Sequence, residues 1–274
     1  MPRTFRKTAS ARAIAHEVAG LQELGGATTA GGVPVAQLAG YTGTTLETIA
    51  ITAVGPSREA AREFGARLAR THAFSNGPRV FGQAPATFPP EFDGVGHMGD
   101  ALLPMVQADS TTPERPAQQA ARRFGEFYAA DRLLPYVKAA VDNGSMPNGQ
   151  VIERLAKRLR DGVFDSPQPH LVATEAALLH GDLWSGNVLW AREGAVLIDP
   201  ACHGGHAESD LAQLRVFGTP FVEDIYAGYH EVSPLADGWR DRIGLHQLHI
   251  LIVHAALFGG SYGRQTIRVA SPYL

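Results

Sequence analysis

The chain has 274 residues, of which 45% are hydrophobic and 19% are charged, and its formal net charge is −3. This composition excludes an intrinsically disordered chain and is typical of a globular protein with one large domain or two lobes. The small negative charge gives no reason to expect nucleic acid or an anionic membrane as a partner.

The single cysteine, Cys202, excludes an internal disulfide and is typical of a protein from a reducing compartment. The first residues contain no apolar core, so we expect no signal peptide. The longest apolar stretch, near residues 250–258, is interrupted by His254 and is too short to span a membrane. These features predict a cytoplasmic protein.

The first part of the chain is predicted to form a small sheet and one helix. Apolar residues three and four positions apart predict the helix, and alternation of side chains predicts the strands. The glycine-rich segment 25–32 follows this helix and lacks the Gly-Lys-Ser/Thr ending of a phosphate-binding loop, so we interpret it as a flexible connector. The expected elements are a strand at 4–8, a helix at 9–24, a strand at 33–38, a turn at 40–44 and a strand at 48–54.

From Ser57 onward the pattern indicates mainly helices. Residues 78–115 are rich in proline and glycine and predict a long loop, which we interpret as part of the rim of an acceptor site. The segment after Asp199 is predicted to be a loop that leads into a helix near residue 207. The expected helices are 58–74, 116–142 with a bend at Pro135, 150–161, 221–230, and 239–258 closed by Gly259 and Gly260.

One stretch carries the clearest chemistry. Residues 180–187 read His-Gly-Asp-Leu-Trp-Ser-Gly-Asn, and two predicted strands, 188–190 and 195–198, lead from there to Asp199. A carboxylate at Asp182 can accept the proton of a hydroxyl nucleophile, whereas Asn187 and Asp199 can hold a divalent metal against phosphate oxygens. This order is the H-x-D-x-x-x-x-N pattern of kinase catalytic loops with the metal-binding aspartate downstream.

A kinase also needs a strand lysine that grips the nucleotide phosphates and a helix glutamate that orients this lysine. Lys7 in the first predicted strand and Glu17 in the first predicted helix supply such a pair in the required order. Taken alone, the two residues could equally be solvated surface charges. Together with the stretch 180–199, they predict a nucleotide-binding pair.

Several histidines are candidate zinc ligands. His203, His206 and Glu208 form one candidate set and His246, His249 and His254 another, but neither has a convincing pattern of four ligands. We therefore expect no zinc site. His203 and His206, with Glu208 beside them, are instead predicted to line the cleft.

The motifs as a whole resemble the fructosamine kinase family, also called ketosamine-3-kinases, within the aminoglycoside-phosphotransferase-like branch of the protein-kinase-like fold. The resemblance is carried by residues 180–187, by Asp199-Pro200-Ala201, by residues 208–212 and by the ending Leu257 to Tyr262. The H-G-D-x-x-x-x-N core alone resembles the whole aminoglycoside-phosphotransferase-like branch. Trp184-Ser185-Gly186 and the Phe-Gly-Gly ending narrow the resemblance to the fructosamine kinase family.

The resemblance implies a role for each matching residue. It makes Asp182 the catalytic base, Asn187 and Asp199 the magnesium ligands, and Lys7 with Glu17 the nucleotide grip. It places the adenine-contacting hinge at Thr52, Ala53 and Val54. It implies that His180 and Asp210 support the catalytic loop from behind, and that Trp184, His203, His206 and Glu208 belong to the acceptor site.

The resemblance implies a two-lobed α+β fold, with a sheet lobe at 1–54, a helical lobe at 55–274, and ATP with Mg²⁺ between them. The implied acceptor is a ketosamine, small or protein-bound, such as fructosyl- or ribulosyl-lysine, and the implied role is deglycation. The alternatives are a kinase of the aminoglycoside or choline type and a non-catalytic pseudokinase. The pseudokinase is suggested because a strand–turn–strand hairpin that precedes the lysine strand in this family has no counterpart before Lys7, and we expect it to be encoded upstream. The sequence does not predict the oligomeric state.

Overall fold

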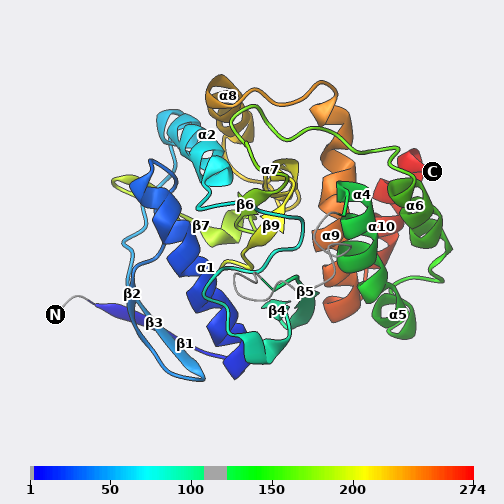
Figure 1. Ribbon diagram of the computed structural model, residues 1–274, viewed down its shortest axis with the longest axis horizontal. Coiled ribbons are helices and arrows are strands. Elements are labelled where there is room, and N and C mark those ends of the chain that lie inside the picture. The colour runs from blue at the N-terminus through cyan, green and yellow to red at the C-terminus, as the bar shows by residue number, and fades with distance from the viewer. Residues whose placement is uncertain (1–2, 108–121) are drawn as a thin grey trace.

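The structure is a computed structural model that describes residues 3–107 and 122–274. A small antiparallel sheet with one long helix lies on one side, and most of the helices lie on the other (Figure 1). The sheet has the strand order β1-β3-β2. Its elements are β1 (Thr4–Thr8), α1 (Ala11–Thr29), β2 (Leu38–Tyr41) and β3 (Thr45–Ile49).

Helix α1 begins after Ser10, whose hydroxyl accepts a hydrogen bond from the Ala13 amide at 3.2 Å and caps the first turn. The expectation that the helix ends before Gly25 and Gly26 is wrong, because α1 continues to Thr29. A Cβ atom on Gly26 would lie 3.1 Å from the Phe74 ring, so this glycine allows the helix to pack closely. Close packing therefore offsets the low helix propensity of glycine here.

The two later strands are shifted from their predicted positions. Residues 33–38 were expected to be a strand of the sheet, but Val35 instead forms an isolated parallel bridge with Leu197. The Ala36 amide donates to the Leu197 carbonyl at 2.8 Å, and the Leu197 amide donates to the Pro34 carbonyl at 2.9 Å. The apolar run at 33–36 thus joins the sheet to the strands that follow the catalytic-loop motif.

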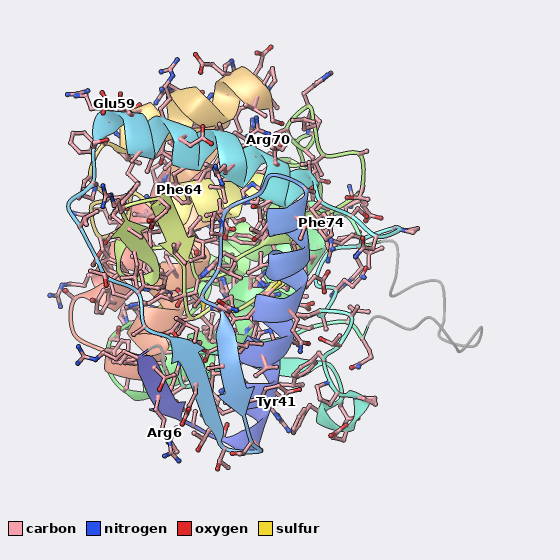
Figure 2. The ribbon with its side chains drawn as sticks, turned by 90° about the vertical axis from the view of Figure 1, so that its left-hand side faces the viewer. Arg6, Tyr41, Glu59, Phe64, Arg70 and Phe74 are labelled. Atoms are coloured by element: carbon pink, nitrogen blue, oxygen red, sulfur yellow. The ribbon has the colours of Figure 1, made fainter. Side chains whose placement is uncertain are left out.

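The remaining helices form the other side of the molecule. Helix α2 packs against α8 through two glycines, Gly65 and Gly228, at each of which an added Cβ atom would overlap a backbone carbonyl of the other helix. Figure 2 shows α2 above the sheet, with Phe64 among the interior side chains. The helices are α2 (Arg58–Ala73), α4 (Phe124–Phe127), α5 (Leu134–Asp142), α6 (Gln150–Arg160), α7 (Ala207–Gln213), α8 (Val222–Val232), α9 (Trp239–Phe258) and α10 (Tyr262–Ala270).

Two of the predicted segments differ from the structure. The predicted loop 78–115 contains a hairpin, β4 (Val95–Met98) with β5 (Ala101–Pro104), and a short 3-10 helix, η1 (Pro90–Phe92). The predicted helix 116–142 lies partly outside the described residues, and its described part is interrupted by a π-helix, η2 (Tyr128–Leu133). Pro135 lies in the first turn of α5, where its missing amide hydrogen costs nothing, so the wide turn precedes the proline.

Four short strands lie between the two sides. Strand β6 (Ala177–Leu179) pairs with β9 (His203–Gly205), and β7 (Val188–Ala191) pairs with β8 (Gly194–Leu197). Strand β9 was not predicted. The loops that join these strands carry the catalytic-loop motif, with the 3-10 turn η3 (Ser185–Asn187), and the segment 198–202. A last 3-10 turn, η4 (Ser271–Tyr273), ends the chain.

Among the described residues, no helix combines the length and the apolar character that crossing a bilayer would require.

Candidate active site

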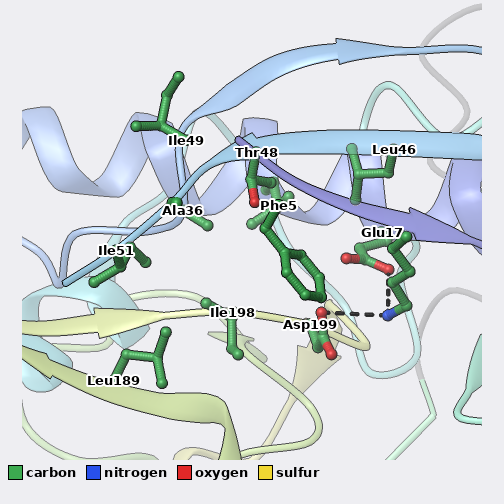
Figure 3. Close-up of a pocket in the computed structure, with 13 residues that line it drawn as sticks. Phe5, Glu17, Ala36, Leu46, Thr48, Ile49, Ile51, Leu189, Ile198 and Asp199 are labelled. Atoms are coloured by element: carbon green, nitrogen blue, oxygen red, sulfur yellow. Dashed lines mark ion pairs between the residues drawn. The ribbon is translucent and has the colours of Figure 1, made fainter. Parts of the chain in front are cut away.

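A cleft of about 220 Å³ lies between the sheet and the central strands (Figure 3). Its walls are mainly apolar, and its charged groups are at one end. The lining residues come from β1, α1, β3 and the central strands: Phe5, Lys7, Glu17, Leu21, Ala36, Leu46, Thr48, Ile49, Ala50, Ile51, Leu189, Ile198 and Asp199. An apolar slot with a charged end suits a flat heterocycle that carries an anionic group.

The charged end consists of Lys7, Glu17 and Asp199. The ammonium of Lys7 lies 2.8 Å from a Glu17 carboxylate oxygen and 3.2 Å from an Asp199 carboxylate oxygen (Figure 3). Burial lowers the pKa of Lys7, but the Glu17 and Asp199 carboxylates raise it by more than burial lowers it. The pKa therefore lies above its ordinary value. Two carboxylates thus share one ammonium.

Asp199 and Asn187 are brought together by the backbone. The Ile198 amide donates to the Asn187 carbonyl at 3.1 Å. Asp199 itself has a φ of 51°, a left-handed conformation that aspartate tolerates better than most residues. His180 supports this bend, because its Nε2 lies 2.9 Å from the Ile198 carbonyl oxygen.

Asp182 is held by Asn187. The Asn187 side-chain amide donates to the Asp182 carbonyl oxygen at 2.8 Å and to its carboxylate at 3.1 Å. Both bonds use the nitrogen, and among the described residues no side-chain hydrogen bond engages the Asn187 amide oxygen. Burial raises the pKa of Asp182 to about 7; the Asn187 hydrogen bond opposes this shift, and the Asp199 and Asp210 carboxylates add to it. A carboxyl group with a pKa near neutrality is suited to proton transfer.

The backbone of the loop is fixed from behind by Asp210. Its buried carboxylate accepts hydrogen bonds from the His180 amide at 2.7 Å, from the Gly181 amide at 3.0 Å and from His72 Nε2 at 3.2 Å. Gln213 adds a second anchor, since its side-chain oxygen accepts from the Leu183 amide at 2.6 Å. Sequence reasoning found Asp210 through the family motif but missed Gln213, which lies three residues later on the same helix and carries no motif.

The predicted hinge is corrected by the structure. Of the chain after β3, the residues that line the cleft are Ala50 and Ile51, whereas Thr52, Ala53 and Val54 lie beyond it. The Val54 amide donates to the Trp190 carbonyl at 2.6 Å and so has a partner already. The difference arises because β3 ends at Ile49, earlier than the predicted strand, so the chain passes the cleft earlier.

Three predicted acceptor-site residues do not reach the cleft. His203, His206 and Glu208 are only 3%, 0% and 3% exposed, inside the helical part of the molecule. Glu208 accepts from the Arg242 guanidinium at 2.6 and 2.8 Å, and this pair, 34 residues apart, has no sequence signature. Burial lowers the pKa of His206 to about 4. The segment that holds these residues was predicted to be a loop, but His203–Gly205 forms strand β9 and pairs with the buried strand β6.

Among the described residues, His206, Glu208 and His246 form a group whose possible ligand atoms lie within 4.8 Å of one another. Both oxygens of Glu208 are already bound by the Arg242 guanidinium, which is itself positive. A metal ion at this place would have to displace a buried ion pair. The Arg242–Glu208 ion pair therefore argues against a metal ion at this group.

The fourth predicted acceptor-site residue, Trp184, is half-buried two residues after Asp182. Its ring meets Phe217 edge to face, with centroids 5.6 Å apart. Phe217 in turn lies 5.0 Å from the His254 ring, and His254 lies 5.1 Å from Tyr262. Trp184 is thus one end of an aromatic row that extends from the catalytic loop across α9 and α10.

Comparisons with known proteins identify the family of the chain. The sequence model of the fructosamine kinase family matches residues 107–274, and the chain belongs to this family. A probable ketoamine kinase of Escherichia coli K12 is 34% identical over 200 residues, which are 72% of this chain and 58% of that protein. The match therefore spans little more than half of that relative's length.

Two solved structures extend the comparison. A crystal structure of a candidate fructosamine-3-kinase from Thermobifida fusca has 36% sequence identity and a TM-score of 0.80, and the match covers 99% of this chain and 85% of that one. A choline/ethanolamine kinase family protein from Mesorhizobium loti shares the fold, with a TM-score of 0.56 at 15% identity, over 98% of this chain and 82% of that one. The predicted two-lobed α+β kinase-like fold is confirmed.

Proposed function

We propose that the protein transfers the γ-phosphoryl group of ATP to a hydroxyl group of a ketosamine. The observation that carries the proposal is a connected set of groups: Lys7, Glu17 and Asp199 meet at one end of the cleft, Asn187 is tied to the Asp199 segment through the Ile198 amide, and Asn187 in turn bonds to Asp182. Each of these groups has a distinct part in phosphoryl transfer, and they come from four separate segments of the chain. The division into a nucleotide-gripping lobe at 1–54 and an acceptor lobe at 55–274 remains part of the proposal.

In this proposal the adenine occupies the apolar slot beside Leu46, Ile49 and Ile51. Among the described residues, no backbone hydrogen bond engages the Ile51 amide, so this group can meet the edge of the base. The Lys7 ammonium contacts the phosphates, and Glu17 keeps it oriented. To do so, Lys7 exchanges its contact with Asp199 for a phosphate oxygen, while its 2.8 Å contact with Glu17 is retained.

The donor set at Asn187 and Asp199 fits magnesium, because an amide oxygen and a carboxylate are the hard oxygen ligands that this ion prefers. When bound, magnesium neutralises charge on the phosphate oxygens. Among the protein's own groups, Lys7 adds to this neutralisation.

Asp182 accepts the proton of the attacking hydroxyl in the proposed reaction. Its Asn187 contact fixes the carboxylate, and its pKa of about 7 lets it hold a proton after transfer. The product is a phosphorylated ketosamine and ADP. Such a step would start the release of the amine from the sugar, which is the proposed deglycation role.

The family and the aromatic row favour a ketosamine over the other acceptors. Trp184, half-buried beside Asp182, offers an apolar face on which a sugar ring can pack. A polycationic aminoglycoside calls for a strongly acidic pocket, and the row Trp184–Phe217–His254–Tyr262 contains no carboxylate. A pseudokinase is disfavoured because the base, both metal ligands and the lysine–glutamate pair are all present.

The test is a phosphoryl-transfer assay with ATP and Mg²⁺ against fructosyl-lysine, ribulosyl-lysine, choline and kanamycin. We expect ADP formation and a phosphorylated product by mass spectrometry with a ketosamine only. Asp142→Asn, which changes an exposed carboxylate of α5, is the matched control for Asp182→Asn. Phosphorylation of kanamycin or choline without a ketosamine would replace the proposed acceptor, and nucleotide binding without any transfer would favour the pseudokinase.

A further inference from the structure

His16 is a buried histidine of α1, one residue before Glu17, and the phosphoryl-transfer chemistry does not use it. Its side chain is only 1% exposed. Its ring nevertheless contacts the backbone of two distant segments. Nε2 lies 2.9 Å from the Cys202 carbonyl oxygen, and Nδ1 lies 3.2 Å from the His97 amide nitrogen and 3.1 Å from the His97 carbonyl oxygen.

These partners define the state of the ring. The Cys202 carbonyl can only accept a hydrogen bond, so Nε2 must carry the proton. Nδ1 faces both the His97 amide, which can only donate, and the His97 carbonyl oxygen, which can only accept; in a ring protonated on Nε2, Nδ1 accepts from the amide and makes no bond to the carbonyl. The neutral ring with its proton on Nε2 is the form that satisfies both the Cys202 carbonyl and the His97 amide. Burial lowers the pKa of His16 to about 4, which keeps the ring neutral at physiological pH.

The Cys202 contact ties α1 to the segment that carries Asp199, three residues earlier. The same two segments touch one turn further along the helix, because a Cβ atom on Gly20 would lie 2.8 Å from Cys202 Cβ. Two fixed contacts on one helix define its position and its rotation relative to the segment. They therefore set the distance across which Lys7 bridges Glu17 and Asp199.

The His97 contact adds the β4–β5 hairpin to this arrangement. Gly96 precedes His97, and a Cβ atom there would lie 2.7 Å from His16 Nδ1. The absence of a side chain at Gly96 thus permits the ring to approach the strand. His16 thus lies where α1, the Cys202 segment and β4 meet. Its ring contacts the backbone of both the Cys202 segment and β4.

We propose that His16 is a positioning residue that holds α1 against the Asp199–Cys202 segment through its Nε2–H···O=C bond to Cys202, and so keeps Glu17 and Asp199 on either side of Lys7. The effect of His16 on turnover rests on the proposed function. Its effect on the contacts of Lys7 with Glu17 and Asp199 does not depend on that function. When the bond is lost, α1 shifts, the carboxylates move apart and Lys7 loses at least one of its two partners.

Two amide substitutions separate the two contacts of the ring. In His16→Gln the side-chain amide nitrogen occupies the place of Nε2 and keeps the bond to Cys202. In His16→Asn the shorter side chain reaches only the place of Nδ1, so the bond to Cys202 is lost. Thr28→Val is the control, because it removes partly buried hydroxyl bonds to Val33 and Leu24 at the far end of the same helix.

The readout is the rate at which an amine-reactive acylating reagent labels each lysine, followed by mass spectrometry. The chain has three lysines, and Lys138 and Lys157 are exposed internal standards. The side chain of Lys7 is 34% exposed, against 86% and 82% for the two standards, and its ammonium is held by two carboxylates, so its amine is less accessible to the reagent. We expect Lys7 of the wild type to react more slowly than both standards. His16→Asn should accelerate the labelling of Lys7 severalfold, while His16→Gln and Thr28→Val should not.

Nucleotide affinity gives the functional arm. The loss of one buried hydrogen bond predicts a rise of about tenfold in the dissociation constant for ATP with Mg²⁺ in His16→Asn, with rescue in His16→Gln. Unchanged labelling of Lys7 in a folded His16→Asn variant overturns the positioning role, whatever the nucleotide affinity. A wild type that binds no nucleotide contradicts the proposed function instead, and the labelling result still decides the role of His16.

Discussion

Replacement of Asp210 by asparagine tests how the catalytic loop is held. One carboxylate oxygen accepts from the His180 amide at 2.7 Å and from His72 at 3.2 Å, and the other accepts from the Gly181 amide at 3.0 Å. In Asp210→Asn the amide oxygen can keep the first pair of bonds. The new NH₂ group then faces the Gly181 amide, donor against donor, and this buried N–H loses its partner.

The size of the effect follows from these contacts. An orphaned buried amide costs about 1–3 kcal/mol, and the two remaining bonds weaken because their acceptor is no longer charged. We expect the free energy of unfolding to fall by about 3 kcal/mol, a large share of the roughly 5–15 kcal/mol that a folded domain has. Turnover should fall as well, because Gly181 precedes Asp182.

The assay is denaturant unfolding followed by circular dichroism. Asp224→Asn is the control, since Asp224 pairs at 3.1 Å with Arg58, an exposed side chain, and a surface pair of this kind contributes at most about 1 kcal/mol. If Asp210→Asn unfolds within about 0.5 kcal/mol of the wild type, the carboxylate does not carry the loop, and the reasoning from these hydrogen bonds is refuted.

Three further predictions concern the site and the core. The folded state holds the Asp182 proton up to a pH of about 7, whereas the unfolded chain releases it near 3.8. Raising the pH between these values should therefore destabilise the wild type by up to ~1.4 kcal/mol per pH unit. Unfolding measured across this pH range should lose this dependence in Asp182→Asn. Gly65→Ala should destabilise the protein by several kcal/mol, about the scale of overpacking, because the new methyl group overlaps the Ile225 carbonyl; an unchanged melting temperature would contradict the close contact of α2 and α8. Asp199→Ala should abolish the magnesium dependence of nucleotide binding in titrations with and without the metal, and a persistent metal effect would move the metal ligand elsewhere.

The sequence predicted the elements whose signals are local. Helices 58–74, 150–161 and 239–258 were found within one residue at each end, because apolar periodicity marks the first two and a glycine or asparagine follows closely after each of the three. The strands on either side of Arg192 were found for the same reason. Lys7, Glu17 and Asp199 were chosen from motif order, and in the structure the Lys7 ammonium lies 2.8 Å from Glu17 and 3.2 Å from Asp199.

The features that were missed depend on tertiary contacts. Strand β9 has three residues and exists only because it pairs with β6. The segment 33–36 looks like a strand of the sheet, but it bonds to Leu197 in the central part. Arg242 lies 34 residues from its partner Glu208, and Cys202 lies 186 residues from its partner His16, so no local sequence pattern predicts these contacts. The inward course of β9 is also why His203 and His206 were wrongly placed in the cleft.

The most direct test of the proposed phosphoryl transfer compares Asp182→Asn with the wild type in steady-state turnover of a ketosamine and in binding of ATP with Mg²⁺. The proposed role of Asp182 as the base predicts that kcat falls on the order of 10²-fold or more while nucleotide affinity is retained, because Asp182 lies outside the residues that line the nucleotide cleft. Near wild-type turnover in Asp182→Asn would contradict the assignment of the base, and with it the reading of residues 180–187 as the catalytic loop.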